Sequence, residues 1–151
     1  MTGDDQAPNV EHFRALERLY AGAPINRAFA STLTVTGPGT TRIEMNATPE
    51  HFHAAGAVHG TLYFKVLDDA AFYAANSLVP EVFMLTTAFN ILMSRPLREG
   101  PIVAEGRWVS GARRVLIAES WLTDASGEEV GRGTGTFMRS RIPLASLADY
   151  T

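Results

Sequence analysis

The segment Val58–Leu78 constrains the fold more than any other part of the chain. It reads VHGTLYFKVLDDAAFYAANSL, is rich in alanine and leucine, has no interior proline and stops before Pro80. Its only charged residues are Lys65, Asp68 and Asp69. A helix that is apolar nearly all round must be buried on most of its sides. Since 151 residues suffice for about one domain, we expect a sheet to wrap around this helix.

Segments with alternating apolar residues predict strands on both sides of the helix. Apolar residues occupy odd positions in Ile25–Thr36, and Thr41–Ala47 alternates in the same way after the turn Gly37-Pro38-Gly39. Four more strands are expected at Val82–Ser94, Ile102–Ser110, Val115–Thr123 and Val130–Met138. The pattern therefore predicts an α+β fold, with an antiparallel β-sheet of about six strands around one long central helix.

The ends of the chain are predicted to be simpler. Residues 1–8 are expected to form a loose tail, and 140–151 a short irregular one. Between the first tail and the first strand, apolar residues recur at helical spacing, which predicts a helix over about 9–21, capped by Asn9 and ended by Gly22 and Pro24. No boundary or repeat divides the chain, so 1–151 is expected to be a single domain.

Composition excludes several classes of function. The net charge of −3 argues against a nucleic-acid or membrane-surface binder, which would need an excess of basic residues. The absence of cysteine removes disulfides, thiolate nucleophiles and cysteine metal ligands. The acidic first residues do not resemble a signal peptide, and no apolar run has the ~18 residues of a membrane span. We expect a cytoplasmic protein.

The stretch Ala55–Asn76 carries the most specific signal. The run Gly56-Ala57-Val58-His59-Gly60, with Asp68 nine residues after the histidine, strongly resembles the PaaI-like branch of the 4-hydroxybenzoyl-CoA thioesterase superfamily. The likeness extends over roughly residues 50–140. It implies a hotdog fold and an acyl-CoA thioesterase that hydrolyses a small aryl- or medium-chain acyl thioester. It also implies that Asp68 is the catalytic carboxylate, as a general base or as a nucleophile.

Further roles follow from the same resemblance. It implies that the helix start at Gly60 and Thr61, next to His59, polarises the thioester carbonyl. Thr86 would orient the attacking water, and strand alternation would place Asn90 on the same face as Thr86. The chain departs from the family pattern twice, with Thr61 replacing the second glycine of the turn and His53 replacing an asparagine. Arg113 and Arg114 lie where relatives contact the phosphates of coenzyme A.

Helical geometry adds a requirement of its own. The N–H groups at a helix start are unpaired and lie at the positive end of the dipole, so they suit a developing oxyanion. Nine residues of helix span ~13 Å, which is too far for His59 and Asp68 to act on one carbonyl within a subunit. The sequence therefore predicts a homodimer with composite sites, or a homotetramer built from such dimers. The chemistry needs no cofactor, and no metal is expected.

Four alternatives remain open at this point. Asp68 could belong to a solvated stripe with Lys65 and Asp69, which are four residues apart and able to pair. A hotdog dehydratase would use His51-Phe52 with His59-Gly60, but position 65 carries lysine where its glutamate would be. A metal could bind His51, His53, His59 and Asp68. The fold could also serve a non-catalytic acyl-CoA-binding protein.

Overall fold

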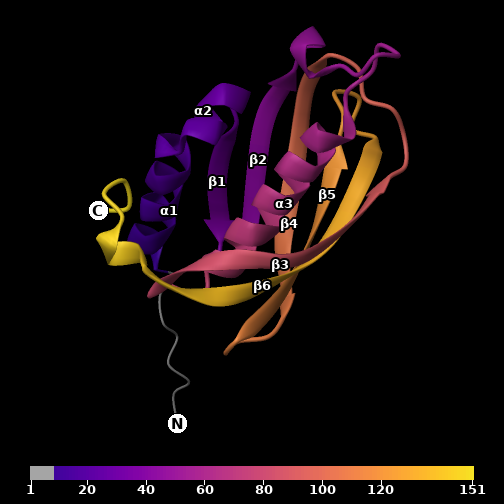
Figure 1. The fold of residues 1–151 in the computed structure, drawn as a ribbon. Coiled ribbons are helices and arrows are strands. Elements are labelled where there is room, and N and C mark those ends of the chain that lie inside the picture. The colour runs from indigo at the N-terminus through magenta and orange to yellow at the C-terminus, as the bar shows by residue number, and fades with distance from the viewer. Residues whose placement is uncertain (1–8) are drawn as a thin grey trace.

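The computed structural model describes residues 9–151 and has two layers (Figure 1). One layer is a six-stranded antiparallel sheet with the order β1-β2-β4-β5-β6-β3. The other is the long helix α3, Gly60–Asn76, which lies across the concave face of that sheet. The predicted α+β architecture, a sheet wrapped around one central helix, is thus confirmed. The predicted tail at 1–8 lies outside the described residues.

The remaining elements follow the predicted order with small changes in their ends. The strands are β1 Thr32–Gly37, β2 Thr40–Ala47, β3 Val82–Met93, β4 Gly100–Ser110, β5 Val115–Thr123 and β6 Glu129–Pro143. The helices before the sheet are α1 Val10–Gly22 and α2 Pro24–Phe29, and two single 3₁₀ turns occur at Pro49–His51 and Leu144–Ser146. No helix within residues 9–151 is long and apolar enough to cross a membrane.

The helix α2 corrects the prediction for the start of the first strand. Residues 25–29 alternate like a strand, but Pro24 occupies the first turn of a helix, where its fixed φ and missing N–H are favourable. The helix ends at Ala30, which adopts the left-handed conformation with φ 53°. The strand β1 begins only at Thr32. At the other end, β6 continues through Pro143 and a 3₁₀ turn follows, so residues 140–146 of the predicted irregular tail have regular structure.

The helix α3 and the sheet are joined by apolar packing and by two buried hydroxyl groups. The apolar side chains of α3 that face the sheet are almost fully buried, including Leu62, Val66 and Leu67. Thr41 of β2 donates its hydroxyl to the Ala70 carbonyl oxygen at 2.6 Å, and Ser120 of β5 donates to the Leu67 carbonyl oxygen at 2.7 Å. Hydroxyl groups on a sheet can therefore lie under a helix without a desolvation penalty, because each has an acceptor.

The strand β3 forms one edge of the sheet. It pairs with β6 along its length, and among the described residues nothing pairs with its other side (Figure 1). Leu85, Leu92 and Met93 of this strand are exposed. A long edge strand with exposed apolar side chains offers its free N–H and C=O groups for pairing with a further strand.

Candidate active site

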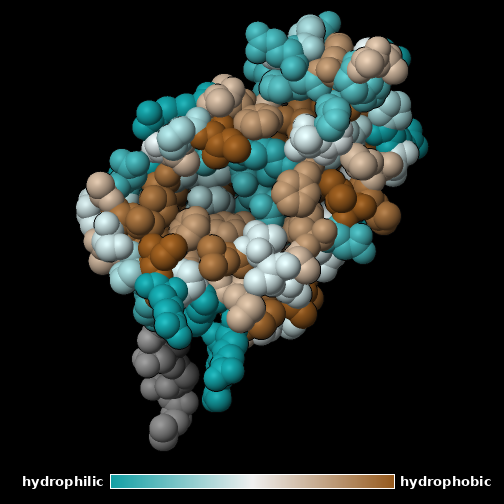
Figure 2. All heavy atoms as spheres, viewed as in Figure 1, coloured by the Kyte–Doolittle hydropathy of each residue, from teal (hydrophilic) through white to brown (hydrophobic). Residues whose placement is uncertain are grey.

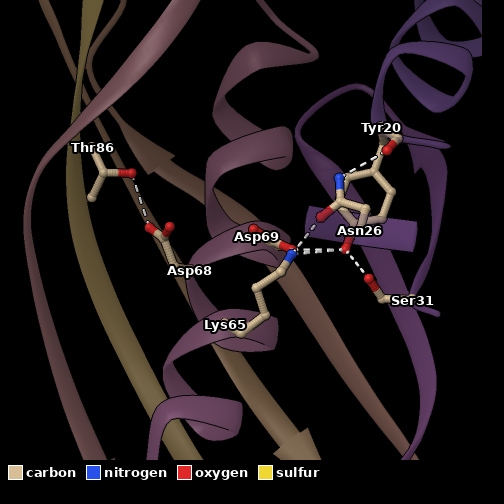
Figure 3. Close-up of polar contacts among 7 residues, drawn as sticks. All are labelled: Tyr20, Asn26, Ser31, Lys65, Asp68, Asp69 and Thr86. Carbon is tan, nitrogen blue, oxygen red and sulfur yellow. Dashed lines mark hydrogen bonds and ion pairs between the residues drawn. The ribbon is translucent and has the colours of Figure 1, made fainter. Parts of the chain in front are cut away.

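Asp68 points from the middle of α3 toward β3 (Figure 3). The Thr86 hydroxyl donates to its Oδ1 atom at 2.9 Å. Burial is the main cause that raises the pKa of Asp68 to about 6, and the charge of Asp69 adds to it, while the Thr86 hydrogen bond and the Lys65 charge act in the opposite direction. A carboxylate with a pKa near neutrality is suited to accept a proton from water. The structure thus brings Asp68 and Thr86 together, as their predicted roles require.

Asp69, one residue later, points in a different direction, toward Lys65 and Tyr20 (Figure 3). It forms an ion pair with Lys65 and accepts a hydrogen bond from the Tyr20 hydroxyl at 2.7 Å. The predicted pairing of Lys65 with Asp69 is confirmed. The alternative of a solvated stripe is wrong for this pair, because only 10% of the Lys65 side chain and 16% of the Asp69 side chain are exposed.

Asp68 and Thr86 border a cavity of about 500 Å³. Its walls are largely apolar and come from α2, α3 and β3. They are formed by Ala23, Ile25, Asn26, Phe29, Thr61, Phe64, Lys65, Asp68, Asp69, Phe72, Tyr73, Phe83 and Thr86. Figure 2 shows this face hollowed near its centre, with hydrophobic side chains around the hollow. A mostly apolar cavity with a few polar groups is typical of a small-molecule site.

The start of α3 lies at a different cavity from Asp68. Gly60 and His53 line a space of about 320 Å³ together with Tyr63 and Met93. Among residues 9–151 no atom accepts a hydrogen bond from the Gly60 N–H, whereas the Thr61 N–H donates to the His59 ring nitrogen Nδ1 at 3.0 Å. Gly60 therefore offers a free donor at the positive end of the helix dipole, and the Thr61 N–H is already used. Thr61 nevertheless lines the cavity of Asp68.

The three histidines of the loop each serve a local turn. The Nδ1 atom of His51 accepts from the Thr48 N–H and that of His53 from the Ala55 N–H, each at 3.0 Å. His59 caps α3 in the same way. Within the part of the chain that the structure describes, no three His, Asp or Glu side chains converge as metal ligands would. The geometry therefore gives the His51, His53, His59 and Asp68 metal site no support.

The structure corrects the prediction that Asn90 lies on the same face of β3 as Thr86. A β-bulge between Thr86 and Ala88 inserts one extra residue into β3, and such an insertion reverses the faces that follow. Thr86 is paired with the buried Phe137, but Asn90 is paired with Thr134 on the outer face. Asn90 is exposed there and does not line the Asp68 cavity. The inward position belongs instead to Phe89, whose ring packs edge-to-face on Phe64 at 5.5 Å between centroids.

Arg113 and Arg114 lie in the turn between β4 and β5 and are exposed. Neither borders the Asp68 cavity of this subunit. Their contact with coenzyme A phosphates stays a prediction. The candidates on α2 are not apparent from the sequence pattern, because residues 25–29 alternate like a strand. The proline that follows Ala23 was the signal for a second helix start.

Known proteins share this architecture, and a family model covers the segment that contains Asp68. The family model of the thioesterase superfamily matches residues 55–130, which include the start of α3 and Asp68. The PaaI protein of the E. coli phenylacetic acid degradation operon superposes with a TM-score of 0.83 at 17% identity, over 91% of this chain and 99% of that one. A thioesterase family protein of Silicibacter pomeroyi gives 0.77 at 23% identity, over 83% and 95%.

A sequence relative points the same way. A Saccharolobus solfataricus protein, whose name assigns it provisionally to the esterases, is 25% identical over 100 residues, 66% of this chain and 67% of that protein. The structural likenesses establish the hotdog fold. The family match covers the residues that form the helix start and its carboxylate. On this ground, the chain belongs to the thioesterase superfamily.

Proposed function

We propose that this protein is an acyl-CoA thioesterase of the cytoplasm that hydrolyses a small aryl- or medium-chain acyl thioester without a metal or cofactor. The observation that carries the proposal is the Asp68 carboxylate. It has a raised pKa and a hydroxyl partner, and it borders a largely apolar cavity of about 500 Å³. An acyl group would occupy the cavity, with its thioester carbonyl close to Asp68.

The reaction can be assigned to groups on this chain. Asp68 accepts a proton from a water that attacks the thioester carbon, and Thr86 helps to orient that water. The carbonyl oxygen gains negative charge, which the Gly60 N–H at a helix start stabilises. The C–S bond then breaks, and the coenzyme A thiolate leaves and takes up a proton. In the nucleophilic variant, Asp68 attacks the carbon itself and water hydrolyses the resulting anhydride.

Two subunits are needed to form this site. Gly60 and Asp68 lie eight residues apart on one helix, which corresponds to ~12 Å along its axis, and they border different cavities. We therefore propose a homodimer in which the α3 start of one subunit faces Asp68 of the other. The uncovered edge of β3 supports this assembly, because it offers a surface for pairing next to Thr86.

A mixed dimer tests this arrangement. Asp68→Asn and Gly60→Val subunits, carrying different tags, would be co-expressed and the heterodimer purified. In a composite site, one of its two sites keeps both native groups, so the heterodimer should have about half of the wild-type kcat. Each parental homodimer should be nearly inactive. An inactive heterodimer would place Gly60 and Asp68 of the same subunit in one site, and a fully active monomer in sedimentation would also contradict the proposal.

The pH dependence gives a second test. Only ionised Asp68 can accept a proton, so kcat/KM should rise about tenfold per pH unit below the pKa of about 6 and level off above it. In Thr86→Val the hydrogen bond that favours the charged form is lost, so the midpoint should move to higher pH. Initial rates between pH 4.5 and 9 would measure both midpoints. An unchanged midpoint in the variant would show that Thr86 does not contact the titrating group.

A screen of acyl-CoA thioesters, with detection of the released thiol, tests the function directly. We expect turnover of aryl or medium-chain substrates, unaffected by chelators. The alternative is a non-catalytic acyl-CoA-binding protein on the same fold. It would bind the same thioesters, release no thiol, and show no dependence on Asp68.

A further inference from the structure

The helix α2 forms one wall of the Asp68 cavity. Asn26 and Phe29 of α2, with Ile25 and the preceding Ala23, face the cavity opposite Phe83 and Thr86 of β3. A helix of six residues is too short to hold its position by its own hydrogen bonds. The position of α2 as a cavity wall therefore depends on the contacts that attach it to α3.

A buried polar cluster makes that attachment (Figure 3). The Lys65 ammonium group donates to Asn26 Oδ1 at 2.6 Å and pairs with Asp69 on the next turn of α3. Asn26 also donates from Nδ2 to the Tyr20 carbonyl oxygen at 2.8 Å, which ties α2 back to α1. The Tyr20 hydroxyl donates to Asp69 at 2.7 Å and lies 2.7 Å from the Ser31 hydroxyl. We refer to Tyr20, Asn26, Ser31, Lys65 and Asp69 as the α2 anchor.

The α2 anchor is neutral overall and fully hydrogen-bonded. Lys65 and Asp69 balance one another's charge, and no buried side-chain nitrogen or oxygen within residues 9–151 lacks a partner. Burial, with the charge of Asp69, raises the pKa of Tyr20, which therefore remains a hydroxyl able to donate. A buried ion pair contributes little net stability compared with apolar packing, but it fixes one geometry, because displacing any member leaves a buried charge unpaired.

Lys65 acts through α2 and not on a substrate. An ammonium group has three protons, and its partners here are Asp69, Asn26 and the Tyr20 hydroxyl, the last at 3.4 Å. No donor is left to bind an acyl group. Lys65 and Asp69 border the same cavity as Asp68, but their side chains are directed toward Tyr20 and Asn26 and not toward Thr86 (Figure 3).

We propose that the α2 anchor determines which acyl groups the Asp68 cavity accepts. Lys65 and Asp69 are positioning residues, which hold α2 in place as one wall of that cavity. This inference rests on the proposed function, in that the cavity takes an acyl group. Loosening the anchor lets α2 move outward, so longer acyl chains fit. Asp68 and Thr86 lie outside the anchor and remain in place, so the change concerns the length of the acyl chain that the cavity accepts.

The test measures binding apart from hydrolysis. S-alkyl-CoA thioethers of increasing chain length, which cannot be hydrolysed, would be titrated by calorimetry into the wild type, Asn26→Ala and the double variant Lys65→Met/Asp69→Leu. Binding of the wild type should tighten about fourfold per methylene until the cavity is full and then stop. In both variants the tightening should continue for longer chains. Arg27→Ala is the matched control, because Arg27 lies on α2 but bonds to the Gly22 carbonyl oxygen at 2.8 Å.

The outcomes separate this proposal from the proposed function. In the hydrolysis assay, kcat/KM for long acyl groups should rise relative to that for short ones in Asn26→Ala, while Arg27→Ala should keep the wild-type ratio. A wild type that binds the thioethers but cleaves no thioester rejects the thioesterase, and the binding profiles still test the anchor. The same chain-length limit in wild type and variants, or equal weakening at every length, overturns the anchor proposal. A wild type that binds no thioether overturns it too.

Discussion

Asp68→Asn should lower kcat by about 10²–10⁴-fold, the usual cost of losing a general base. Asparagine keeps the shape of the side chain and can still accept the hydrogen bond from Thr86, so substrate binding should be retained. The amide cannot take a proton from water. Steady-state kinetics on the best thioester of the screen would measure the loss, and thioether titration would confirm that binding persists.

The same variant should be more stable than the wild type at pH 8. Burial raises the pKa of Asp68 from 3.8 to about 6, so the folded state favours the protonated acid. The wild type therefore loses stability as the pH rises from about 4 to 6, because Asp68 ionises in the unfolded chain before it ionises in the folded protein. Below both pKa values, the stability difference between Asp68→Asn and the wild type disappears. Denaturant titrations at pH 4 and pH 8 would measure the gap between the two proteins.

Glu105→Gln is the matched control for this substitution. Glu105 lies on β4 with 45% of its side chain exposed, and the ion pair that it forms with Arg42 spans 3.9 Å. Carboxylate-to-amide exchange at this site should leave kcat and stability near wild type. Asp69 is unsuitable as a control because it belongs to the α2 anchor. If Asp68→Asn retains full activity on every thioester that the wild type cleaves, Asp68 is not the catalytic group.

Gly106→Ala should strongly destabilise the folded protein. Gly106 of β4 lies directly beneath α3, and a Cβ atom added there would be 2.1 Å from the Ala70 carbonyl oxygen and 2.6 Å from the Thr41 hydroxyl oxygen. The first of these is backbone, so the helix and the sheet would have to separate. Overpacking of this kind costs about 3 kcal/mol of unfolding free energy. For a chain of this size, that lowers the melting temperature by roughly 6–12 °C.

Gly37→Ala provides the comparison, because its added Cβ would meet only the Thr40 hydroxyl oxygen, at 3.3 Å. Its melting temperature should stay within a few degrees of wild type. Calorimetric unfolding of both variants would measure the difference. Equal stability of Gly106→Ala and Gly37→Ala would mean that α3 does not approach the sheet at Gly106 as closely as the structure places it.

The sequence by itself determined the architecture, because that information is local and strongly periodic. An apolar segment of helical composition, flanked by alternating segments, has few solutions other than burial against a sheet, and α3 Gly60–Asn76 lies where Val58–Leu78 predicted it. The resemblance to the thioesterase superfamily, carried in part by the nine-residue spacing from His59, also indicated Asp68. Asp68 and Asp69 point in different directions because successive helical residues are rotated by about 100°, and the four-residue spacing of Lys65 and Asp69 allowed their pairing to be anticipated.

Only the tertiary structure decided where the other groups lie. The face of Asn90 depends on a bulge at Thr86–Ala88, which arises from pairing with β6 and leaves no local pattern. The segment 25–29 alternates like a strand, but it folds as part of α2. Pro24 starts that helix, and Asn26 accepts a hydrogen bond from Lys65 of α3. Alternation and helical spacing describe each segment alone. The partner of an edge, a bulge or a buried charge depends on residues far away in the chain, and only the folded structure brings those together.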